Sequence, residues 1–336
     1  MRALEIHGID DLRIVERPAP EPAHDEVQVA VEWGGICGSD IAYWRRGVSG
    51  TAVMRDPFIL GHEVSGRIAR LGSAVTGLEL GRAVTVHPAR TSGPLPERLV
   101  GRDNLHPHLT YLGSAAQTPH TGGGFAELIT VQADQIVPLP EGLDTRRAVL
   151  AEPLGVALHA VRRAGNIRGA HVVVAGCGPI GLLVIVAARA AGAARVTAVD
   201  PSAPARERAL RVGADAVQDS AEQLDPRVTV AFEASGVPAS LDTILRSIAR
   251  AAVVVQVGNL PPTPVEVGLG PIVSKEIDYR GSYRFVCEIE EAVAILAGDD
   301  LAEHVISHEL PLDDAAAAFA TQVSDPTSSK VILRIG

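Results

Sequence analysis

One segment, residues 171–200, constrains the fold of this chain more than any other. It reads HVVVAG, then a turn with three glycines, an apolar run with helical spacing, and RVTAVD. A short apolar run that leads through a glycine-rich turn into a helix predicts a βαβ unit. Similar patterns follow in VTVAFEASG, PASLDTILRSIARAA and VVVQVG. We therefore expect an α/β fold with a doubly wound parallel sheet that carries helices on both faces.

The glycine spacing of this segment predicts a dinucleotide site. The turn has the form G-x-G-x-x-G, it opens a helix, and an aspartate ends the next strand. Such glycines let the backbone approach a pyrophosphate, whose charge is met by free N–H groups at the helix N-terminus. The alternative is a glycine-rich turn without a ligand, and the strand and acid that follow argue against it. The predicted cofactor-binding residues are Gly176, Gly178, Pro179, Ile180, Gly181 and Asp200.

Asp200 also indicates which dinucleotide binds. A carboxylate at this position accepts hydrogen bonds from the adenosine ribose hydroxyls and repels a 2′-phosphate. Residues 201–205 contain no arginine or lysine that could neutralise such a phosphate. We therefore expect NAD rather than NADP.

The first part of the chain has a different pattern. Up to about residue 140, short alternating segments such as VQVAVEW, RAVTV and AELITV are separated by Gly, Pro and Asp. This alternation predicts half-buried strands, and hence a β-rich domain. We expect that domain at 1–152, the dinucleotide-binding domain at 153–286, and a segment at 287–336 that returns to the first domain.

Composition and charge exclude several other classes of protein. With 336 residues the chain exceeds the usual size of a single core. Its net charge of −10 and the absence of a basic patch argue against nucleic acid or an acidic lipid surface as a partner. No export signal is visible, and glycines and a proline interrupt the apolar residues 170–188, so we expect a cytoplasmic protein without a membrane span. Three scattered cysteines indicate no disulfide framework.

Three side chains in the first domain have the chemistry of metal ligands: Cys37 in CGSD, His62 in GHE and Glu152 in AEPLG. Each has a plainer interpretation, as a small core residue, a hydrogen-bonded core imidazole and an exposed helix residue. Beside a dinucleotide site, however, a thiolate, an imidazole and a carboxylate fit a catalytic zinc, which has three protein ligands and a water. Sulfur and nitrogen donors favour zinc over magnesium or calcium.

Two longer motifs, GGICGSD at 34–40 and GHEVSGRIARLGSAV at 61–75, resemble those of the zinc-containing medium-chain alcohol and polyol dehydrogenases. The resemblance covers nearly the whole chain. It is strongest to the sorbitol and L-idonate 5-dehydrogenases, through EPLGVALHA, GCGPIGLL, FEASG and KEIDYRGSYRF. It implies a GroES-like catalytic domain, a Rossmann NAD-binding domain, and a homodimer or homotetramer joined through the cofactor domains.

The resemblance also implies roles for individual residues. Cys37, His62 and Glu152 would be zinc ligands, and Glu63 would lie near the metal, able to exchange with one of them. Asp40 would orient the ligand histidine. Zinc would act as a Lewis acid on a secondary hydroxyl of the substrate. Ser39 would then accept the hydroxyl proton, and hydride would pass to the nicotinamide. The segment VQVG adds Val257 to the cofactor-binding residues that the resemblance implies.

Two further residues bear on the substrate, which the resemblance implies is a polyol or an aldonate such as L-idonate. Tyr43 matches a tyrosine that lines the substrate cleft of polyol dehydrogenases, where its hydroxyl can hold a sugar alcohol. Arg284, in GSYRF, matches an arginine near the same cleft, and a guanidinium can grip a carboxylate with two hydrogen bonds. The alternative is that Arg284 pairs with a structural acid such as Glu152.

The sequence departs from the family pattern in two places. Ala42 stands where many relatives have a histidine that passes on the proton, so solvent or the cofactor ribose would have to serve. No cysteine lies between Cys37 and Cys177, although many relatives bind a structural zinc with four cysteines in the lobe that corresponds to 90–109. We expect one catalytic zinc and no structural zinc. The matching positions are Ser92, Leu95, Arg98 and His106.

Two other functions remain as alternatives. One is a zinc-free, NADPH-dependent enone or quinone reductase of the same superfamily, and the joint presence of Cys37, His62 and Glu152 speaks against it. The other is an NAD-binding sensor without turnover, which the complete set of chemical groups makes the weaker interpretation.

Overall fold

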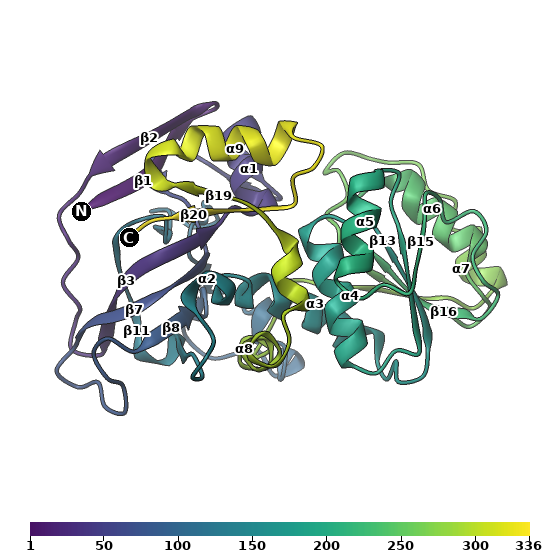
Figure 1. Cartoon of the computed structure of the whole chain (residues 1–336), viewed down its shortest axis with the longest axis horizontal. Helices are drawn as coiled ribbons and strands as arrows, with labels where there is room; N and C mark the ends of the chain where they lie inside the picture. The colour runs from purple at the N-terminus through teal and green to yellow at the C-terminus, as the bar shows by residue number, and fades with distance from the viewer. The chain divides into compact units, whose positions relative to one another are not determined.

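The chain passes back and forth between two folding units, which the computed structural model describes over all residues, 1–336. Unit 1 consists of Met1–Glu152, Ile289–Gly298 and Ile306–Gly336, and unit 2 of Pro153–Glu288 and Asp299–Val305. Unit 1 is rich in β-strands, and unit 2 alternates strands with helices, as Figure 1 shows. The predicted α/β class, in which the chain has both a doubly wound sheet and a β-rich unit, is confirmed.

Unit 1 is built on a seven-stranded sheet in the order β12-β8-β7-β3-β20-β19, with β11 also paired to β3. The segments VQVAVEW, RAVTV and AELITV contribute three of these strands, and their inward residues form the core of the unit. A second sheet has the order β2-β1-β6, and α9 (Ala315–Ser324) packs on β19 and β20. The strands are β1 (Arg2–Gly8), β2 (Asp11–Glu16), β3 (Glu26–Gly35), β6 (Phe58–Ile59), β7 (Glu63–Leu71), β8 (Ala83–Val86), β11 (Leu128–Gln132), β12 (Ile136–Pro138), β19 (Ile306–Pro311) and β20 (Lys330–Arg334).

Strand β20 lies between β3 and β19 in this sheet. It pairs antiparallel with the end of β3, where Gly35 faces Ile332, and parallel with β19. Successive residues of a strand point to opposite faces, so Lys330 shares a face with Ile332, which is fully buried. The register therefore carries Lys330 into the interior of unit 1.

The lobe at 90–109 has short regular elements rather than one open loop. It contains β9 (Ala89–Thr91), two 3₁₀ turns at Glu97–Leu99 and Asp103–Leu105, and β10 (Leu109–Tyr111), which pairs with β9. The amphipathic stretch after residue 144 forms α2 (Thr145–Ala148) in unit 1 and α3 (Ala151–Ala164), which begins in unit 1 and continues in unit 2. Helix α8 (Ile289–Gly298) belongs to unit 1.

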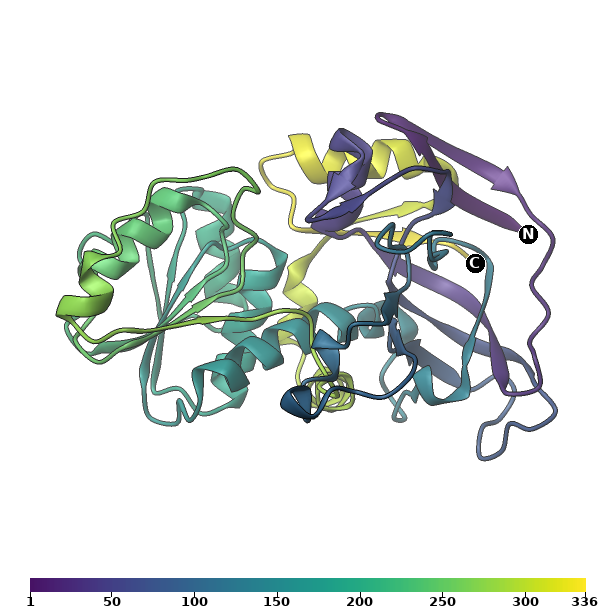
Figure 2. The ribbon, with the colours of Figure 1, turned by 180° about the vertical axis from the view of Figure 1, so that it is seen from behind.

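Unit 2 is a six-stranded parallel sheet in the order β15-β14-β13-β16-β17-β18. In chain order this is 3-2-1-4-5-6, the Rossmann arrangement. The strands are β13 (His171–Ala175), β14 (Arg195–Val199), β15 (Ala216–Gln218), β16 (Val228–Glu233), β17 (Val253–Gln256) and β18 (Asp278–Gly281). Figures 1 and 2 show α4 (Pro179–Ala190) and α5 (Ala203–Arg211) on one face, with α6 (Pro238–Ser247) and α7 (Gly270–Ser274) on the other.

The stretch 170–188 forms β13, the turn and most of α4, as expected. The valines of β13 are fully buried, which fits a central strand covered on both faces. None of the helices is both long and apolar enough to cross a lipid bilayer.

Candidate functional site

Strand pairing brings the predicted metal ligands of unit 1 together. Cys37 follows β3 and precedes α1 (Gly38–Arg46), while His62 directly precedes β7 and Glu63 begins it. Because β3 and β7 are antiparallel neighbours and Gly35 pairs with Glu63, the loop after β3 lies beside the start of β7. Asp40 ties the two together: its carboxylate accepts the N–H of Cys37 at 2.9 Å and that of Gly61 at 3.3 Å.

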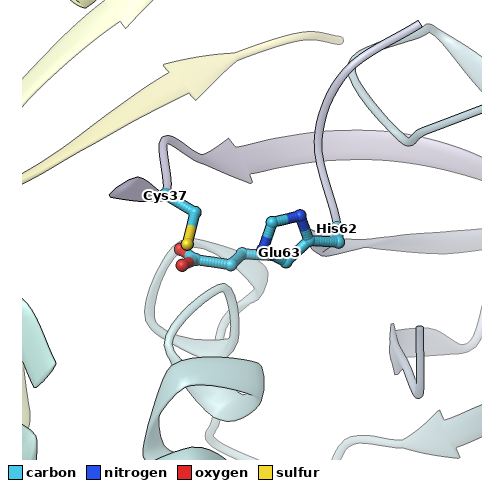
Figure 3. Close-up of side chains that lie close together, drawn as sticks. All are labelled: Cys37, His62 and Glu63. Carbon is cyan, nitrogen blue, oxygen red and sulfur yellow. The ribbon is translucent and has the colours of Figure 1, made fainter. Parts of the chain in front are cut away.

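The three side chains form a compact donor set. The Cys37 Sγ, a ring nitrogen of His62 and a carboxylate oxygen of Glu63 all lie within 4.8 Å of one another. Figure 3 shows the Cys37 sulfur directed at the Glu63 carboxylate, with the His62 ring beside both. Two ligands of a tetrahedral zinc lie roughly 3.5 Å apart, given bonds of about 2.0–2.3 Å. The geometry and the mixture of sulfur, nitrogen and oxygen therefore fit zinc.

The surroundings of His62 favour a positive charge at this point. Burial lowers the pKa of this imidazole, but the negative charges of Cys37, Asp40 and Glu152 outweigh that effect and raise the pKa to about 10. Burial also raises the pKa of Asp40 and of Glu152. A bound cation would relieve the repulsion among these buried acids, which is a second reason to regard the cluster as a metal site.

The dinucleotide loop of unit 2 has the predicted shape. Gly176 has φ 93°, a left-handed value, and a Cβ on Gly181 would lie 1.8 Å from the Gly176 carbonyl oxygen. Gly178 precedes α4, and a Cβ there would meet no atom within 4 Å. These are the three uses of glycine in a pyrophosphate-binding turn: a sharp bend, open space for the ligand, and close packing of helix on strand.

Asp200 lies next to this loop, directly after β14. Its carboxylate accepts the N–H of Cys177 and that of Ser202, both at 2.8 Å. Arg206, one residue beyond the window considered in the sequence, lies close by, and its Nη1 donates to the carbonyl oxygens of Asp200 at 2.7 Å and Pro201 at 2.9 Å. A cation is thus nearer to Asp200 than the sequence indicated. Val257 follows β17, and its N–H donates to the Glu233 carbonyl oxygen at 2.8 Å.

Comparison with known proteins agrees with this geometry. The model of the alcohol dehydrogenase GroES-like domain matches residues 23–141, and that of the zinc-binding dehydrogenases matches residues 179–298. Sorbitol dehydrogenase of Bos taurus is 34% identical over 334 residues, which cover 95% of this chain and 92% of that protein. The chain belongs to the zinc-binding medium-chain dehydrogenases. It is an oxidoreductase of their alcohol and polyol class.

Other relatives of this dehydrogenase extend over the same length. L-idonate 5-dehydrogenase (NAD(P)(+)) of Escherichia coli K12 is 33% identical over 313 residues, covering 91% of this chain and 90% of that protein. The crystal structure of an L-idonate 5-dehydrogenase from Escherichia coli K-12 superimposes with a TM-score of 0.92 at 31% identity, over 99% of this chain and 97% of that one. The structure of 2R,3R-butanediol dehydrogenase from Bacillus subtilis gives 0.90 at 30% identity, over 100% and 99%.

Glu63 and Glu152 occupy different places in the dehydrogenase. Glu63 completes the compact donor set, whereas Glu152, in the first turn of α3, lies outside it. Glu152 is 4% exposed and accepts a hydrogen bond from the Tyr111 hydroxyl at 2.5 Å. The sequence predicts Glu152 as a zinc ligand and Glu63 as a residue near the metal, whereas in the structure Glu63 is the carboxylate that lies with Cys37 and His62. A role for Glu152 as a ligand stays a prediction.

Gly35 explains how Glu63 reaches this position. A Cβ on Gly35 would lie 2.2 Å from Glu63 Oε2, so any other residue at this position would collide with the carboxylate. Steric contact with Glu63 therefore explains why the second residue of GGIC is glycine.

Lys330 lies at the donor set although its place there was not predicted from the sequence. Its Nζ is 2.7 Å from both carboxylate oxygens of Glu63 and 3.0 Å from the carbonyl oxygen of Ile36. Burial lowers the pKa of this amine, but Glu63 and the neighbouring anions raise it more. The signal available in the sequence was a lysine that leads directly into the apolar run VIL of the last strand. Tyr111 was also missed, because nothing in its own segment marks it.

The remaining predicted residues lie in four different settings. Ser39 is partly exposed in the first turn of α1, two residues from Cys37. Tyr43 is 2% exposed, and its hydroxyl oxygen accepts the N–H of Ala115 at 3.0 Å. Arg284 belongs to unit 2, has a left-handed φ of 50°, and places its guanidinium 5.0 Å from the centre of the Tyr283 ring. Asp40 accepts hydrogen bonds from the backbone N–H groups of Cys37 and Gly61, and a role for Asp40 in orienting His62 stays a prediction.

Proposed function

We propose that this dehydrogenase oxidises a secondary hydroxyl of a polyol or a sugar acid of the L-idonate type, with NAD as hydride acceptor. The observation that carries the proposal is the compact donor set of Cys37, His62 and Glu63 in a chain that also has a complete dinucleotide loop. The names of its relatives, sorbitol, L-idonate and butanediol dehydrogenases, support hydroxyl groups on small polar molecules as substrates.

In this proposal the residues of unit 1 hold the metal and move the proton. Cys37, His62 and Glu63 bind zinc, and Glu152 is an alternative carboxylate. Zinc, when bound, supplies Lewis-acid polarisation of the substrate hydroxyl. Ser39, in the first turn of α1, accepts the proton of the substrate hydroxyl. Because residue 42 is a buried alanine, the proton then leaves through solvent or the cofactor ribose.

The residues of unit 2 bind the cofactor. The loop 176–181 holds the pyrophosphate at the N-terminus of α4, Asp200 accepts hydrogen bonds from the adenosine ribose, and Val257 flanks the cofactor. We assign the catalytic domain to 1–152 with 287–336, and the NAD-binding domain to 153–286.

We further propose a homodimer or homotetramer joined through unit 2, because β18 is an edge strand and Val273 near it is 81% exposed. Light scattering with Val273→Asp tests that contact.

Tyr43 and Arg284 are proposed to recognise the substrate. The Tyr43 hydroxyl already accepts one hydrogen bond and can donate its own proton to a sugar hydroxyl. Arg284 is proposed to grip a carboxylate with its two parallel N–H groups. If so, Arg284→Lys raises KM for an aldonate much more than for a neutral polyol, because lysine keeps the charge but loses the fork. Equal losses on both would make Arg284 structural and favour a neutral polyol as substrate.

The deciding experiment is a panel of polyols, aldonates and simple alcohols with NAD or NADP, read by absorbance of the reduced nicotinamide. Turnover of polyols or aldonates with NAD supports the proposal. Reduction of an enone or quinone with NADPH by metal-free protein would support a reductase instead. Tight NAD binding without turnover of any member would indicate a sensor.

We also propose a single zinc per chain. The positions in the lobe that would match structural cysteines include His106, which is 6% exposed, with Nε2 3.3 Å from the Gly93 carbonyl oxygen and Nδ1 accepting the N–H of His108 at 3.0 Å. These bonds hold the lobe without a thiolate cluster. Elemental analysis of purified protein tests the count, and two tightly bound zinc ions per chain would refute it.

A further inference from the structure

Glu233 is a fully buried carboxylate on which four hydrogen-bond donors converge. It is the last residue of β16 and is 0% exposed. Its Oε1 accepts hydrogen bonds from the hydroxyl of Ser235 and, at 3.0 Å, from the N–H of the same residue. Its Oε2 accepts the N–H of Gly236 at 3.0 Å and the side-chain amide of Gln256 at 2.6 Å. Because burying a charge costs free energy, this carboxylate needs an explanation in terms of what it holds in place.

The orientation of the Gln256 amide is set by its partners. Its Nε2 donates to Glu233 Oε2 and, at 2.7 Å, to the carbonyl oxygen of Gly258, while its Oε1 accepts the hydroxyl proton of Tyr279 at 3.0 Å. Burial and the negative charge of Glu233 raise the pKa of Tyr279, so this hydroxyl stays a donor at neutral pH. Tyr279, on the edge strand β18, thus directs the amide nitrogen of Gln256 at the carboxylate.

Glu233 thereby fixes the loops that follow two neighbouring strands. Its carboxylate binds two successive N–H groups of the loop after β16. Through Gln256, the last residue of β17, it also holds the carbonyl group of Gly258. Its own carbonyl oxygen accepts the N–H groups of Val257 and Gly258, each at 2.8 Å. One residue therefore sets the position of both loops.

These two loops and the dinucleotide loop are packed backbone against backbone. A Cβ on Gly176 would lie 2.6 Å from the Ser235 nitrogen, and a Cβ on Gly258 would lie 2.3 Å from the Gly236 nitrogen. Contacts of this kind cannot be relieved by rotating a side chain. A shift of either loop is therefore transmitted toward the turn that begins at Gly176.

The place of these loops in the sheet relates them to the cofactor. The strand order reverses between β13 and β16, and a doubly wound sheet binds its dinucleotide across that switch point. In the proposed function the loop 176–181 and Asp200, on the side of β13 and β14, take the pyrophosphate and the adenosine ribose. The other end of the dinucleotide, the nicotinamide with its ribose, then lies over the loops after β16 and β17.

We propose that Glu233 is a positioning residue for the nicotinamide half of the cofactor, acting through the backbone of 235–236 and 257–258. This inference rests on the proposed binding of NAD. The four donors that bind the carboxylate belong to the protein, so Glu233 acts on the cofactor through the loops that it holds. Held at a fixed spacing, the two loops present the nicotinamide in one orientation for hydride transfer.

Other roles for Glu233 predict different results. If it only ties β16 to β17, its loss lowers the melting temperature and leaves the affinity for nucleotides unchanged. If it supports the dinucleotide loop as a whole through Gly176, its loss weakens the binding of ADP and NADH alike. Only the proposed role separates these two ligands, because ADP lacks the nicotinamide half.

The test compares the binding of NADH and of ADP to the full-length protein by calorimetry, which needs no turnover. We expect Glu233→Gln, which keeps the size of the side chain and removes its charge, to weaken NADH binding about tenfold and ADP binding less than about threefold. The fluorescence emission of bound NADH should also move toward that of free NADH, because the ring is held less firmly. Equal weakening of both ligands, or unchanged NADH binding, would overturn the proposal.

Two further variants keep the result interpretable. Glu207→Gln, at an exposed position of α5, is the matched control and should bind both ligands like the wild type. Gln256→Met removes the amide that links Glu233 to Gly258, so it replaces Glu233→Gln if that variant does not fold, and the same selective loss of NADH binding is required of it. Wild-type protein that binds neither NADH nor ADP would refute the proposed function. Wild-type binding without a selective loss in these variants would refute only this inference.

Discussion

The two sites of this dehydrogenase are built in opposite ways. The dinucleotide loop of unit 2 is one continuous run of backbone, 176–181, completed by Asp200 at the end of the next strand. The metal site of unit 1 consists of side chains from segments that are far apart, and Lys330 and Glu63 are separated by 267 residues. A site of backbone groups depends on local chain geometry, whereas a site of side chains depends on the register of a whole sheet.

This difference predicts which substitutions each site tolerates. The backbone loop should be sensitive to any added Cβ and indifferent to distant changes, while the metal site should be sensitive to the identity of single side chains.

Cys37→Ser should abolish turnover, by about a hundredfold or more, because even groups that only support a metal ligand cost ten- to a hundredfold when removed. Binding of NADH should stay close to the wild type, since the dinucleotide loop belongs to the other unit. Turnover is read by NADH absorbance and cofactor binding by fluorescence. The control is Cys287→Ser, at an exposed cysteine of unit 2, which should remain active. Full activity of Cys37→Ser would remove zinc from the mechanism.

Asp200→Ser should erode the preference for NAD over NADP by about tenfold or more, the scale of one charge-assisted hydrogen bond. Arg206 strengthens this expectation, because it lies beside Asp200 and would face the 2′-phosphate once the carboxylate is gone. The measurement is kcat/KM with each cofactor. A wild type that already uses NADP faster than NAD would defeat the argument.

Two glycines of the same loop should behave differently. Gly178→Ala leaves the fold intact, because nothing lies within 4 Å of the new Cβ, yet it fills space meant for the pyrophosphate and should weaken NAD binding about tenfold. Gly181→Ala drives a Cβ into the Gly176 carbonyl and should lower the melting temperature of the protein. Calorimetry with and without NAD separates the two. Equal losses of stability would mean that the loop is not built around open space at Gly178.

We expect the smallest effect on turnover from a substitution of Glu288, a charged side chain that stabilises unit 2. Burial raises the pKa of this carboxyl, but hydrogen bonds from His159 and from the N–H of Val286 outweigh that effect and lower it to about 2. Because the folded pKa lies below the ordinary value of 4.5, the stabilisation is complete above about pH 4.5 and is lost as the pH falls toward 2.

Glu288→Gln should therefore cost about 2 kcal/mol of unfolding free energy at neutral pH and reduce the acid dependence of stability. Urea unfolding between pH 7 and pH 3 measures both effects, with Glu207→Gln, at an exposed position of α5, as the matched control. Parallel pH profiles for wild type and Glu288→Gln would assign the acid sensitivity to other groups.

The same contrast explains how much the sequence could predict. The dinucleotide site was visible because its glycines and Asp200 are close in the chain and each has a local steric or electrostatic reason. Cys37 and His62 could be proposed only as a combination, supported by the family resemblance. The order of Glu63 and Glu152 could not be obtained, since it depends on the pairing of Gly35 with Glu63. Lys330 escaped notice because no local pattern reveals a strand register set between such distant segments.

The position of β20 between β3 and β19 bears on the order of events during synthesis. Its partner β3 leaves the ribosome about 300 residues earlier, and at about 5–20 residues per second that interval lasts roughly 15 to 60 seconds. During this time the nascent chain contains Cys37, His62 and Glu63 but not the ammonium that compensates them. Zinc delivered in that interval would meet a carboxylate with no competing partner, so the time at which the ion arrives determines whether the metal or the last strand reaches Glu63 first.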